Sequence, residues 1–295
     1  MYIVMGGTGH VGSAVVAALR REGQEVTALT RNADHAGRAR AAGAGIAEVD
    51  IRDRGALQAA LRQGRRAFLL NPPADVSEDT DAVEKSTIAC ILDALRGSGL
   101  EKVVGASTGG AQPGERLGDL NTLWTLEEGL RQQPIPAAIN RAAYYMTNWD
   151  GLLETVRTTG RLPTLFPADL PIPMVSPDDV GAAAARRLTT STDDVGVRYV
   201  TGPRDYTPAE VAAVFARCLD RPVTVDVVPR ADWTAWFGQL GFSPSAAESY
   251  ARMTACCVDD GFDVPQDAWR GPTTLESHLD ALMKRTMAQP QDAGG

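Results

Sequence analysis

The stretch YIVMGGTGHVG, from Tyr2 to Gly12, decides the fold of this chain. Its first four residues are apolar and predict a short buried strand, and residues 13–21 then repeat apolar side chains at helical spacing. Between them lies a G-x-x-G-x-x-G turn. Such a turn lets a dinucleotide pyrophosphate lie against backbone N–H groups at a helix N-terminus, where a Cβ atom would hold the phosphates away. We expect six turn residues to bind a dinucleotide: Gly6, Thr8, Gly9, His10, Val11 and Gly12.

Short apolar segments alternate with helical segments over the first half of the chain. Strands are expected at residues 2–5, 24–29, 44–49, 66–70, 102–106 and 136–140, and helices at residues 13–21, 56–61, 80–96 and 117–132. Strands that are apolar throughout are typical of a parallel sheet with both faces covered by helices. With right-handed crossovers, the pattern predicts an α/β, doubly wound Rossmann domain over residues 1–148 that contains the dinucleotide-binding turn.

The pattern changes after Asn148. Prolines gather between residues 163 and 177, and the regular alternation of strands and helices stops. We expect residues 149–288 to form a smaller, mostly helical substrate lobe whose late strands are interleaved with the main sheet. Its expected helices cover residues 180–188, 231–240 and 245–257, and its expected strands cover residues 197–201 and 223–228. The polar residues 289–295 are expected to be a disordered tail.

Composition and charge exclude several classes of protein. The 295 residues carry a formal net charge of −8, which argues against nucleic acid as a partner because phosphate binding needs a Lys/Arg surface. The four cysteines show no CxxC spacing, so we expect reduced thiols in a cytoplasmic protein and no metal site. Because the first expected strand begins at Tyr2, we expect no signal peptide. No apolar run reaches the roughly 20 residues of a membrane span, and the oligomeric state stays open.

The end of the second strand indicates which dinucleotide is bound. An acidic residue there would accept a hydrogen bond from the 2′-hydroxyl of NAD, but this chain has Thr30 and Arg31. A guanidinium can pair with a 2′-phosphate, so we expect NADP(H) to be the cofactor. The alternative is that Arg31 is a solvated surface residue.

Residues after the third and fourth strands complete the expected cofactor site. Asp50 is placed to accept a hydrogen bond from the adenine amino group, and Ile51 to cover the ring. Asp53 is expected to cap the following helix. Asn71 and Pro72 should line the crevice where the order of the strands reverses.

Several stretches together resemble the NmrA-like branch of the atypical short-chain dehydrogenase/reductases. They are GGTGHVG, TRN, VDIRD, STGGAQP, INRAAYYMTNW, PMVSPDDVGAAAARRL and YVTGPRDYTPAEVAAVF, and they are spread over most of the chain. The resemblance implies an NADP-binding reductase of quinones, dyes or aromatic ketones, or a redox sensor without catalysis. Within that range, the chain is more weakly similar to the ketoreductases that tailor aromatic polyketides.

The chain departs from the wider short-chain reductases at the proton donor. Those enzymes protonate the reduced oxygen with a Tyr supported by a Lys, and the corresponding places fall near Asp119 and Leu123, where neither residue type occurs. Ser107 matches the family's serine and is a candidate catalytic and cofactor-binding residue, with a structural hydrogen bond as the alternative. The missing proton can come from water, from a phenol on the substrate, or from Tyr144 as a replacement acid. His10 can contact the cofactor or substrate, or simply face solvent.

Aromatic side chains are concentrated after the sixth strand and in the expected lobe. The candidate substrate-binding residues are Tyr144, Tyr145, Trp149, Trp233, Phe237 and Tyr250. They suit a flat, apolar ligand, and the alternative is that they form the core of the lobe. The favoured hypothesis is NADPH-dependent reduction of a carbonyl on an aromatic, quinonoid or polyketide-like substrate. A general quinone or azo-dye reductase and a non-catalytic NADP(H) sensor remain as alternatives.

Overall fold

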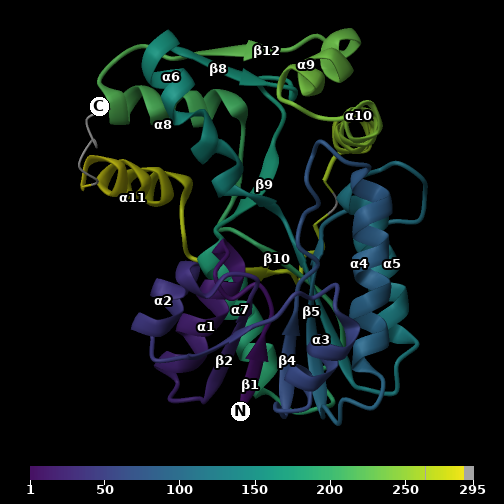
Figure 1. Cartoon of the computed structure of the whole chain (residues 1–295). Coiled ribbons are helices and arrows are strands. Elements are labelled where there is room, and N and C mark those ends of the chain that lie inside the picture. Colours follow the sequence, from purple (N-terminus) through teal and green to yellow (C-terminus); the bar gives the residue numbers. More distant parts are fainter. Residues whose placement is uncertain (263, 289–295) are drawn as a thin grey trace, which may run out of the picture.

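A parallel sheet forms the centre of the molecule. The computed structural model describes residues 1–262 and 264–288, so the expected tail lies outside the described residues. Within them, eight strands pair in parallel in the order β13-β10-β6-β5-β4-β1-β2-β3 (Figure 1). Their bounds are β1 (Tyr2–Val4), β2 (Val26–Thr30), β3 (Gly45–Glu48), β4 (Arg66–Leu69), β5 (Lys102–Thr108), β6 (Ala137–Ala142), β10 (Gly196–Thr201) and β13 (Trp269–Arg270). The order reverses at β1, which confirms the predicted doubly wound α/β fold.

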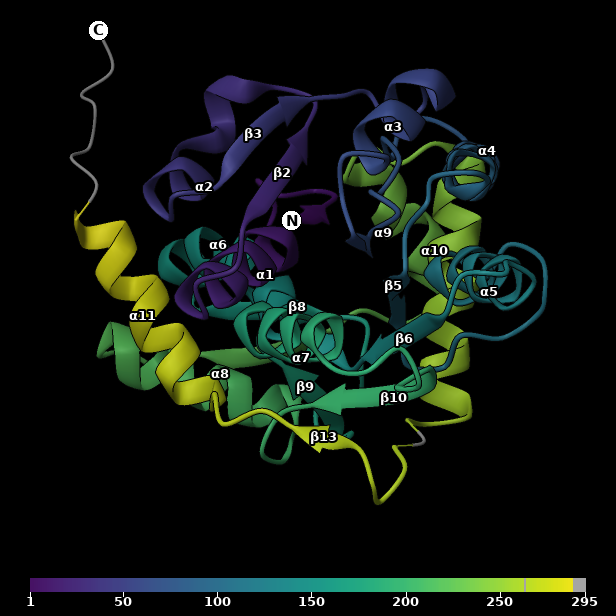
Figure 2. The same cartoon turned by 90° about the horizontal axis from the view of Figure 1, so that it is seen from below.

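Helices cover both faces of this sheet (Figure 2). They are α1 (His10–Arg21), α2 (Gly37–Ala41) and α7 (Pro177–Thr189) on one face, and α3 (Arg54–Leu61), α4 (Thr80–Leu95) and α5 (Asp119–Arg131) on the other. Alternate strand residues serve the two faces, because successive side chains of a strand point in opposite directions. Val4 and Phe68 pack in the core with α1 and α7, whereas Ile3 and Ala67 pack in the core with α3, α4 and α5.

The beginnings of the helices follow local capping signals. The Asp53 carboxylate accepts a hydrogen bond from the Ala56 N–H at 3.0 Å, which confirms the predicted cap of α3. Asp79 caps α4 in the same way, through the Ala82 N–H at 3.2 Å. Helix α1 has no such side-chain cap and begins at His10, three residues before the expected start. The glycine turn therefore leads directly into the helix.

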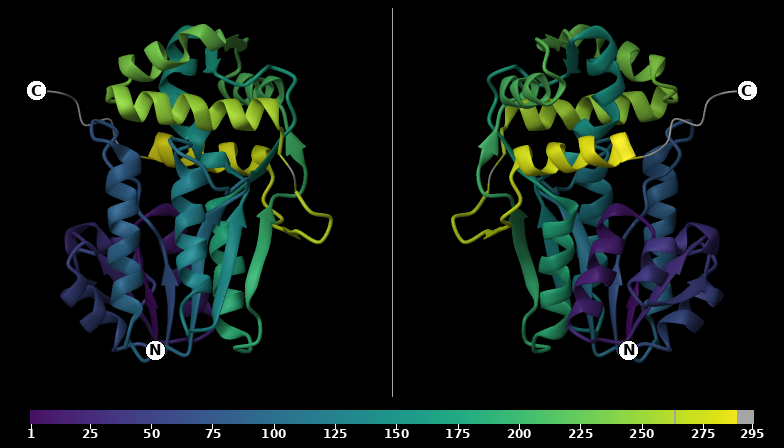
Figure 3. Two further views of the ribbon diagram at one scale, coloured as in Figure 1. Left: turned by 90° about the vertical axis from the view of Figure 1, so that its right-hand side faces the viewer. Right: turned by 90° about the vertical axis from the view of Figure 1, so that its left-hand side faces the viewer.

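A short 3-10 helix, η1 (Ala33–Ala36), connects β2 to α2, and the other elements form a lobe beside the carboxyl ends of the parallel strands (Figures 1 and 3). We call them the lobe: β7 (Tyr144–Tyr145), η2 (Met146–Leu152), α6 (Leu153–Thr159), β8 (Arg161–Thr164), β9 (Ile172–Val175), β11 (Asp205–Tyr206), α8 (Pro208–Leu219), β12 (Thr224–Val227), η3 (Arg230–Asp232), α9 (Trp233–Gln239), α10 (Pro244–Asp259) and α11 (Leu275–Ala288). Strands β7, β9 and β11 form one small sheet, and β8 and β12 form another. The expected strand at 197–201 joins the main sheet as β10, but the one at 223–228 is β12 and pairs with β8 instead.

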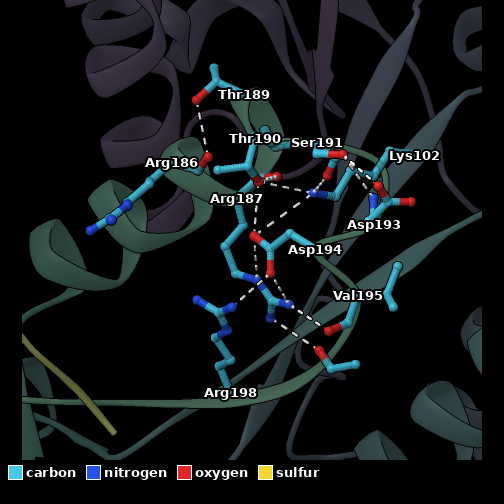
Figure 4. A network of polar contacts seen from close by, with 12 residues as sticks. Lys102, Arg186, Arg187, Thr189, Thr190, Ser191, Asp193, Asp194, Val195 and Arg198 are labelled. Atoms are coloured by element: carbon cyan, nitrogen blue, oxygen red, sulfur yellow. Dashed lines mark hydrogen bonds and ion pairs between the residues drawn. The ribbon is translucent and has the colours of Figure 1, made fainter. Parts of the chain in front are cut away.

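A cluster of buried charged side chains lies at the other end of the sheet, away from the lobe, where the chain passes from α7 to β10 (Figure 4). Lys102 is fully buried at the start of β5, and its Nζ donates to the Ser191 carbonyl at 2.8 Å and lies 3.9 Å from an Asp194 oxygen. The Arg187 guanidinium donates to Asp194 at 3.0 Å and to the Ile139 carbonyl at 3.0 Å. Burial lowers the pKa of Lys102 to about 8, with the Asp194 charge opposing that shift. This cluster joins α7 to the strands far from the lobe.

Candidate functional site

The glycine turn presents free backbone N–H groups at the carboxyl end of β1. Gly6 has φ +62° and its carbonyl accepts from the Gly9 N–H at 2.9 Å, which folds the turn tightly. A Cβ on Gly12 would lie 2.1 Å from the Gly6 oxygen, so this position requires glycine. Because no side chain in the described residues caps α1, its first N–H groups are available to an anion at the positive end of the helix dipole.

Helix α7 holds α1 in this position. A Cβ on Gly181 would lie 2.4 Å from the Cβ of Ala14, so the two helices cross nearly backbone to backbone. The Thr8 hydroxyl, inside the turn, lies 3.3 Å from the Thr30 hydroxyl at the end of β2. The turn is thereby tied to the neighbouring strand, and His10 is exposed beside it.

A cavity of about 380 Å³ lies where an adenosine end is expected. Four of the predicted cofactor residues line it together: Arg31, Asp50, Ile51 and Pro72. Arg52 lines it as well and places a second guanidinium there, 3.4 Å from an Asp50 oxygen. The Arg52 N–H also donates to the Asp50 carboxylate at 3.0 Å and holds the pKa of that carboxyl below its ordinary value. Sequence reasoning missed Arg52, although the arginine in VDIRD was a visible signal.

Asn71 carries an unsatisfied polar atom directly after β4. Its side chain is 9% exposed, and its Oδ1 has no hydrogen-bond partner in the described residues. A buried acceptor without a donor is costly, which makes this position a candidate for contact with a bound ligand. The unpartnered oxygen is compatible with a contact between Asn71 and the cofactor, and that contact remains a prediction.

Ser107 takes part in a buried ion-pair network. Its hydroxyl donates to a Glu127 oxygen at 2.5 Å, and Glu127 is fully buried. The Arg141 guanidinium donates twice to Glu127, each time at 2.8 Å, and once to the Tyr199 hydroxyl at 3.0 Å. The Ser107 proton is therefore engaged in the structural hydrogen bond that the sequence left as one alternative. Its oxygen retains lone pairs for a ligand, and a catalytic role remains a prediction.

The aromatic residues after β6 pack mostly into the lobe. Tyr144 lies with its ring centroid 5.8 Å from that of Trp149 and 5.5 Å from that of Phe166. Trp149 is 2% exposed, and its indole N–H has no partner in the described residues. Burial raises the pKa of Tyr144 to about 12, so this phenol is a weak acid at neutral pH. The structure places Trp149 in the core of the lobe, as the alternative interpretation has it, and a substrate contact for this residue remains a prediction.

A second aromatic cluster joins α9 to α10. The Phe237 ring centroid lies 5.8 Å from that of Tyr250 and 5.0 Å from that of Phe242. Trp233 is 5% exposed and donates its indole N–H to the Val228 carbonyl at 3.0 Å. Trp233 and Phe237 are thus buried in the lobe, which agrees with the alternative that these aromatic residues form its core. Tyr250 is half-buried. Substrate contacts for these residues remain predictions.

A buried acidic group lies between α4, α5 and α10, and sequence reasoning did not find it. Asp81 and Glu84 come from the first turns of α4, and Asp119 is the first residue of α5. The Asn121 amide donates to Asp81 at 3.1 Å, and the Thr122 hydroxyl donates to Glu84 at 2.9 Å. Burial, reinforced by the neighbouring negative charges, raises the pKa of Glu84 to about 7 and raises the pKa of Asp119. The available signal was that these three acidic residues lie in the first turns of the helices that follow β4 and β5.

Two negative findings apply to residues 1–262 and 264–288. None of the helices there combines the length and the apolar character needed to cross a bilayer. In the same residues, no group of three or more His, Cys, Asp or Glu side chains is arranged to hold a metal ion.

Comparison with known proteins gives matches along most of the chain. A family model described as "NmrA-like family" matches residues 2–279. The NAD(P)H azoreductase of Xenophilus azovorans is 24% identical over 260 residues, which cover 88% of each chain.

Two solved structures have the same fold. Triphenylmethane reductase of Citrobacter sp. superposes with a TM-score of 0.79 at 18% identity, covering 96% of this chain and 99% of that one. An NADPH-dependent quinone oxidoreductase of Escherichia coli, solved with NADPH, gives a TM-score of 0.77 at 21% identity, with the same coverage. The NADPH in that complex agrees with the cofactor predicted from Arg31.

Proposed function

The chain belongs to the NmrA-like family, and on that premise we propose that it transfers a hydride from NADPH to a flat aromatic acceptor. The acceptor class is a carbonyl on an aromatic, quinonoid or polyketide-like molecule. The observation that carries the proposal is the uncapped start of α1, together with a cavity lined by Arg31, Asp50, Ile51 and Pro72. The names of its relatives, which include reductases of dyes and quinones, support the same reaction class.

The residues present fit the pyrophosphate and the adenosine end of NADPH. The first N–H groups of α1 would hold the pyrophosphate, and Gly12 lets the start of α1 pack closely against the backbone of Gly6 in the turn. Arg31 and Arg52 would pair with the 2′-phosphate, since both guanidinium groups line the cavity. The bound nicotinamide supplies the hydride. In this proposal the aromatic residues of the lobe would confine the acceptor, and the lobe elements within residues 149–288 would bind the substrate.

There is one alternative class of acceptor, the azo dyes, and one alternative role for the protein, an NADP(H) sensor. The azoreductase relative favours an azo dye as a second candidate acceptor. A non-catalytic NADP(H) sensor would bind the cofactor without turnover. Binding alone therefore does not separate the sensor from the reductase.

The deciding experiment measures NADPH oxidation by the purified protein with a panel of acceptors. We expect the nicotinamide absorbance to fall in the presence of naphthoquinones, phenolic ketones or azo dyes. Cofactor fluorescence, titrated in parallel, measures binding. Binding without oxidation by any acceptor would support the sensor and contradict both reductase proposals.

A further inference from the structure

The loop between β4 and α4 forms one wall of the cavity proposed for the adenosine end of NADPH. We call residues 72–78 the cavity loop, and they supply six of the twelve residues that line this cavity. The Ala74 N–H donates to Glu84 at 3.2 Å and holds the beginning of the loop against α4. The Ser77 N–H donates to the Asp75 carboxylate at 2.9 Å and folds its turn. The position of the cavity loop therefore sets the shape of the cavity.

Ser243, at the start of the lobe helix α10, holds the cavity loop through two hydrogen bonds. Its N–H donates to the Val76 carbonyl at 2.8 Å, and its hydroxyl donates to the Glu78 carbonyl at 2.7 Å. In the part of the chain that the structure describes, no other hydrogen bond reaches the cavity loop from outside β4, α4 and the loop between them. The middle of the cavity loop is thus held by the lobe.

Ser243 is itself fixed by the lobe. It is the N-cap of α10, and its hydroxyl accepts from the Ala246 N–H at 3.1 Å. The preceding Phe242 packs its ring against those of Phe237 and Tyr250, with the centroids 5.0 Å apart in each pair. The Ser243 hydroxyl therefore serves the helix and the cavity loop at once, and the aromatic cluster beside it keeps it in place.

A second contact keeps α10 on α4 independently of Ser243. The Ser249 hydroxyl donates to the Asp81 carboxylate, and it accepts from the Gly118 N–H at 3.0 Å. Replacing Ser243 should therefore release the cavity loop and leave α10 in place. The effect of the loop on the cofactor can then be separated from the packing of the lobe.

We propose that Ser243 is a positioning residue for the cofactor, which holds the wall of the adenosine cavity from the lobe. It does not line that cavity, so its effect passes through the Val76 and Glu78 carbonyls. Without these bonds the cavity loop would occupy the binding conformation for a smaller fraction of the time, and the apparent Kd rises by the inverse of that fraction. The assignment rests on the proposed function for the identity of the ligand, NADPH.

Two variants remove the contacts step by step. Ser243→Gly removes the hydroxyl bond to Glu78 and keeps most of the helix stability, because Gly is only slightly poorer than Ser as an N-cap. Ser243→Pro also removes the N–H bond to Val76, and the φ of −62° at this position is one that proline adopts. Ser243→Thr retains both donors. The matched control is Thr207→Gly, which makes the same kind of change at the N-cap of α8, where the side chain does not bond to the cavity loop.

The probes are NADPH, its adenosine half 2′,5′-ADP, and its nicotinamide half, reduced nicotinamide mononucleotide, all titrated by calorimetry. We expect Ser243→Gly to raise the Kd of NADPH and of 2′,5′-ADP by roughly 3- to 10-fold, which corresponds to one hydrogen bond, and Ser243→Pro to raise both further. The Kd of the nicotinamide half should not change, and Ser243→Thr and Thr207→Gly should leave every Kd unchanged. With a working acceptor, the KM for NADPH should rise in Ser243→Gly and Ser243→Pro while kcat stays constant.

Hydrogen exchange measures the cavity loop itself, without any ligand. The Ser77 and Glu78 amides, which both bond to Asp75, should exchange faster in Ser243→Pro than in the wild type. Unchanged exchange at these amides, an unchanged Kd for 2′,5′-ADP, or equal losses for both halves of the cofactor overturns the assignment. A wild type that binds 2′,5′-ADP but oxidises no NADPH contradicts the proposed function and leaves the assignment of Ser243 standing.

Discussion

Arg31 is exposed at the end of β2 and lines the cavity proposed for the adenosine end of the cofactor. A charge-assisted hydrogen bond to the 2′-phosphate would contribute about 1.5–3 kcal/mol, or roughly 10- to 100-fold in affinity. Arg31→Ala should therefore raise the Kd for NADPH by about that factor and leave the Kd for NADH nearly unchanged. Isothermal titration with both cofactors measures this difference. Equal losses for the two would contradict the 2′-phosphate role.

Arg52 provides a comparison within the same cavity. Its guanidinium is already held near Asp50, with 3.4 Å between Nε and Oδ1, so it has less freedom to reach a phosphate than Arg31. We expect Arg52→Ala to weaken NADPH binding less than Arg31→Ala, by up to about 10-fold. The same titrations measure it. A larger loss for Arg52→Ala than for Arg31→Ala would reassign the 2′-phosphate contact.

Glu84 makes the stability of the fold depend on pH. Its pKa is raised from 4.5 to about 7, so the folded protein binds its proton more tightly than the unfolded chain. The stabilisation from this proton is complete below pH 4.5 and is lost as pH rises through 7. It is worth up to about 3 kcal/mol, so Glu84→Gln should gain stability relative to wild type across this window. Urea unfolding at pH 5 and pH 8 tests it, and parallel curves for the two proteins would contradict it.

The sequence predicted the positions of single residues best where the local backbone conformation determines them. The glycine turn, the Asp53 cap and the cavity residues follow from φ, from capping and from the ends of the strands, which local sequence determines. Ser107, Trp149 and Glu84 were harder because their roles depend on partners distant in the chain. The Glu127 that engages Ser107 and the Ser249 that engages Asp81 cannot be read from neighbouring residues.

At the scale of elements, strands and helices with strong periodic patterns were predicted nearly in place, whereas the lobe was predicted only in part. Helix α8 begins with the sequence TPAE, in which Thr207 and Glu210 form a reciprocal capping box, yet no helix was expected there. The short strands β7 and β11 have two residues each, too few for any pattern to be visible. Strand β12 was expected, but its partner was not, because pairing is decided by tertiary packing.

The connection between α7 and β10 depends on one carboxylate. Asp194 accepts from Arg187 at 3.0 Å and from Thr190 at 2.8 Å, and it faces the fully buried Lys102 (Figure 4). Removing one partner leaves buried cations without compensation, so Asp194→Ala should lower the free energy of unfolding by about 3–5 kcal/mol. The exposed neighbour Asp193 is the control, and Asp193→Ala should cost less than about 1 kcal/mol. Denaturant titration measures both, and similar small effects would show that solvent replaces the ion pair.

The whole molecule is connected by a chain that passes repeatedly between the sheet and the lobe. After β6 it enters the lobe, returns through α7 and β10, enters the lobe again, returns as β13 and ends in α11 (Figures 1 and 3). The Asp150 carboxylate and the His278 ring, 2.7 Å apart, then join α11 to the rest of the lobe. Because several chain segments connect the sheet to the lobe, unfolding of either part disturbs the other. This connectivity favours a single cooperative unfolding transition.

This connectivity predicts how the cofactor affects stability. NADPH at 100 times its Kd should stabilise the folded state by about 2.7 kcal/mol by mass action. Although its proposed contacts lie mostly at the sheet, the lobe should gain the same stability, because both parts unfold together. Fluorescence of Trp149 and Trp233, both buried in the lobe, reports on the lobe once the other tryptophans are replaced by Phe, and far-UV circular dichroism reports on the whole chain. We expect both transitions to coincide and to move by equal amounts when NADPH is added. A lobe transition that precedes the other, or that NADPH leaves in place, would show that the lobe unfolds independently of the sheet.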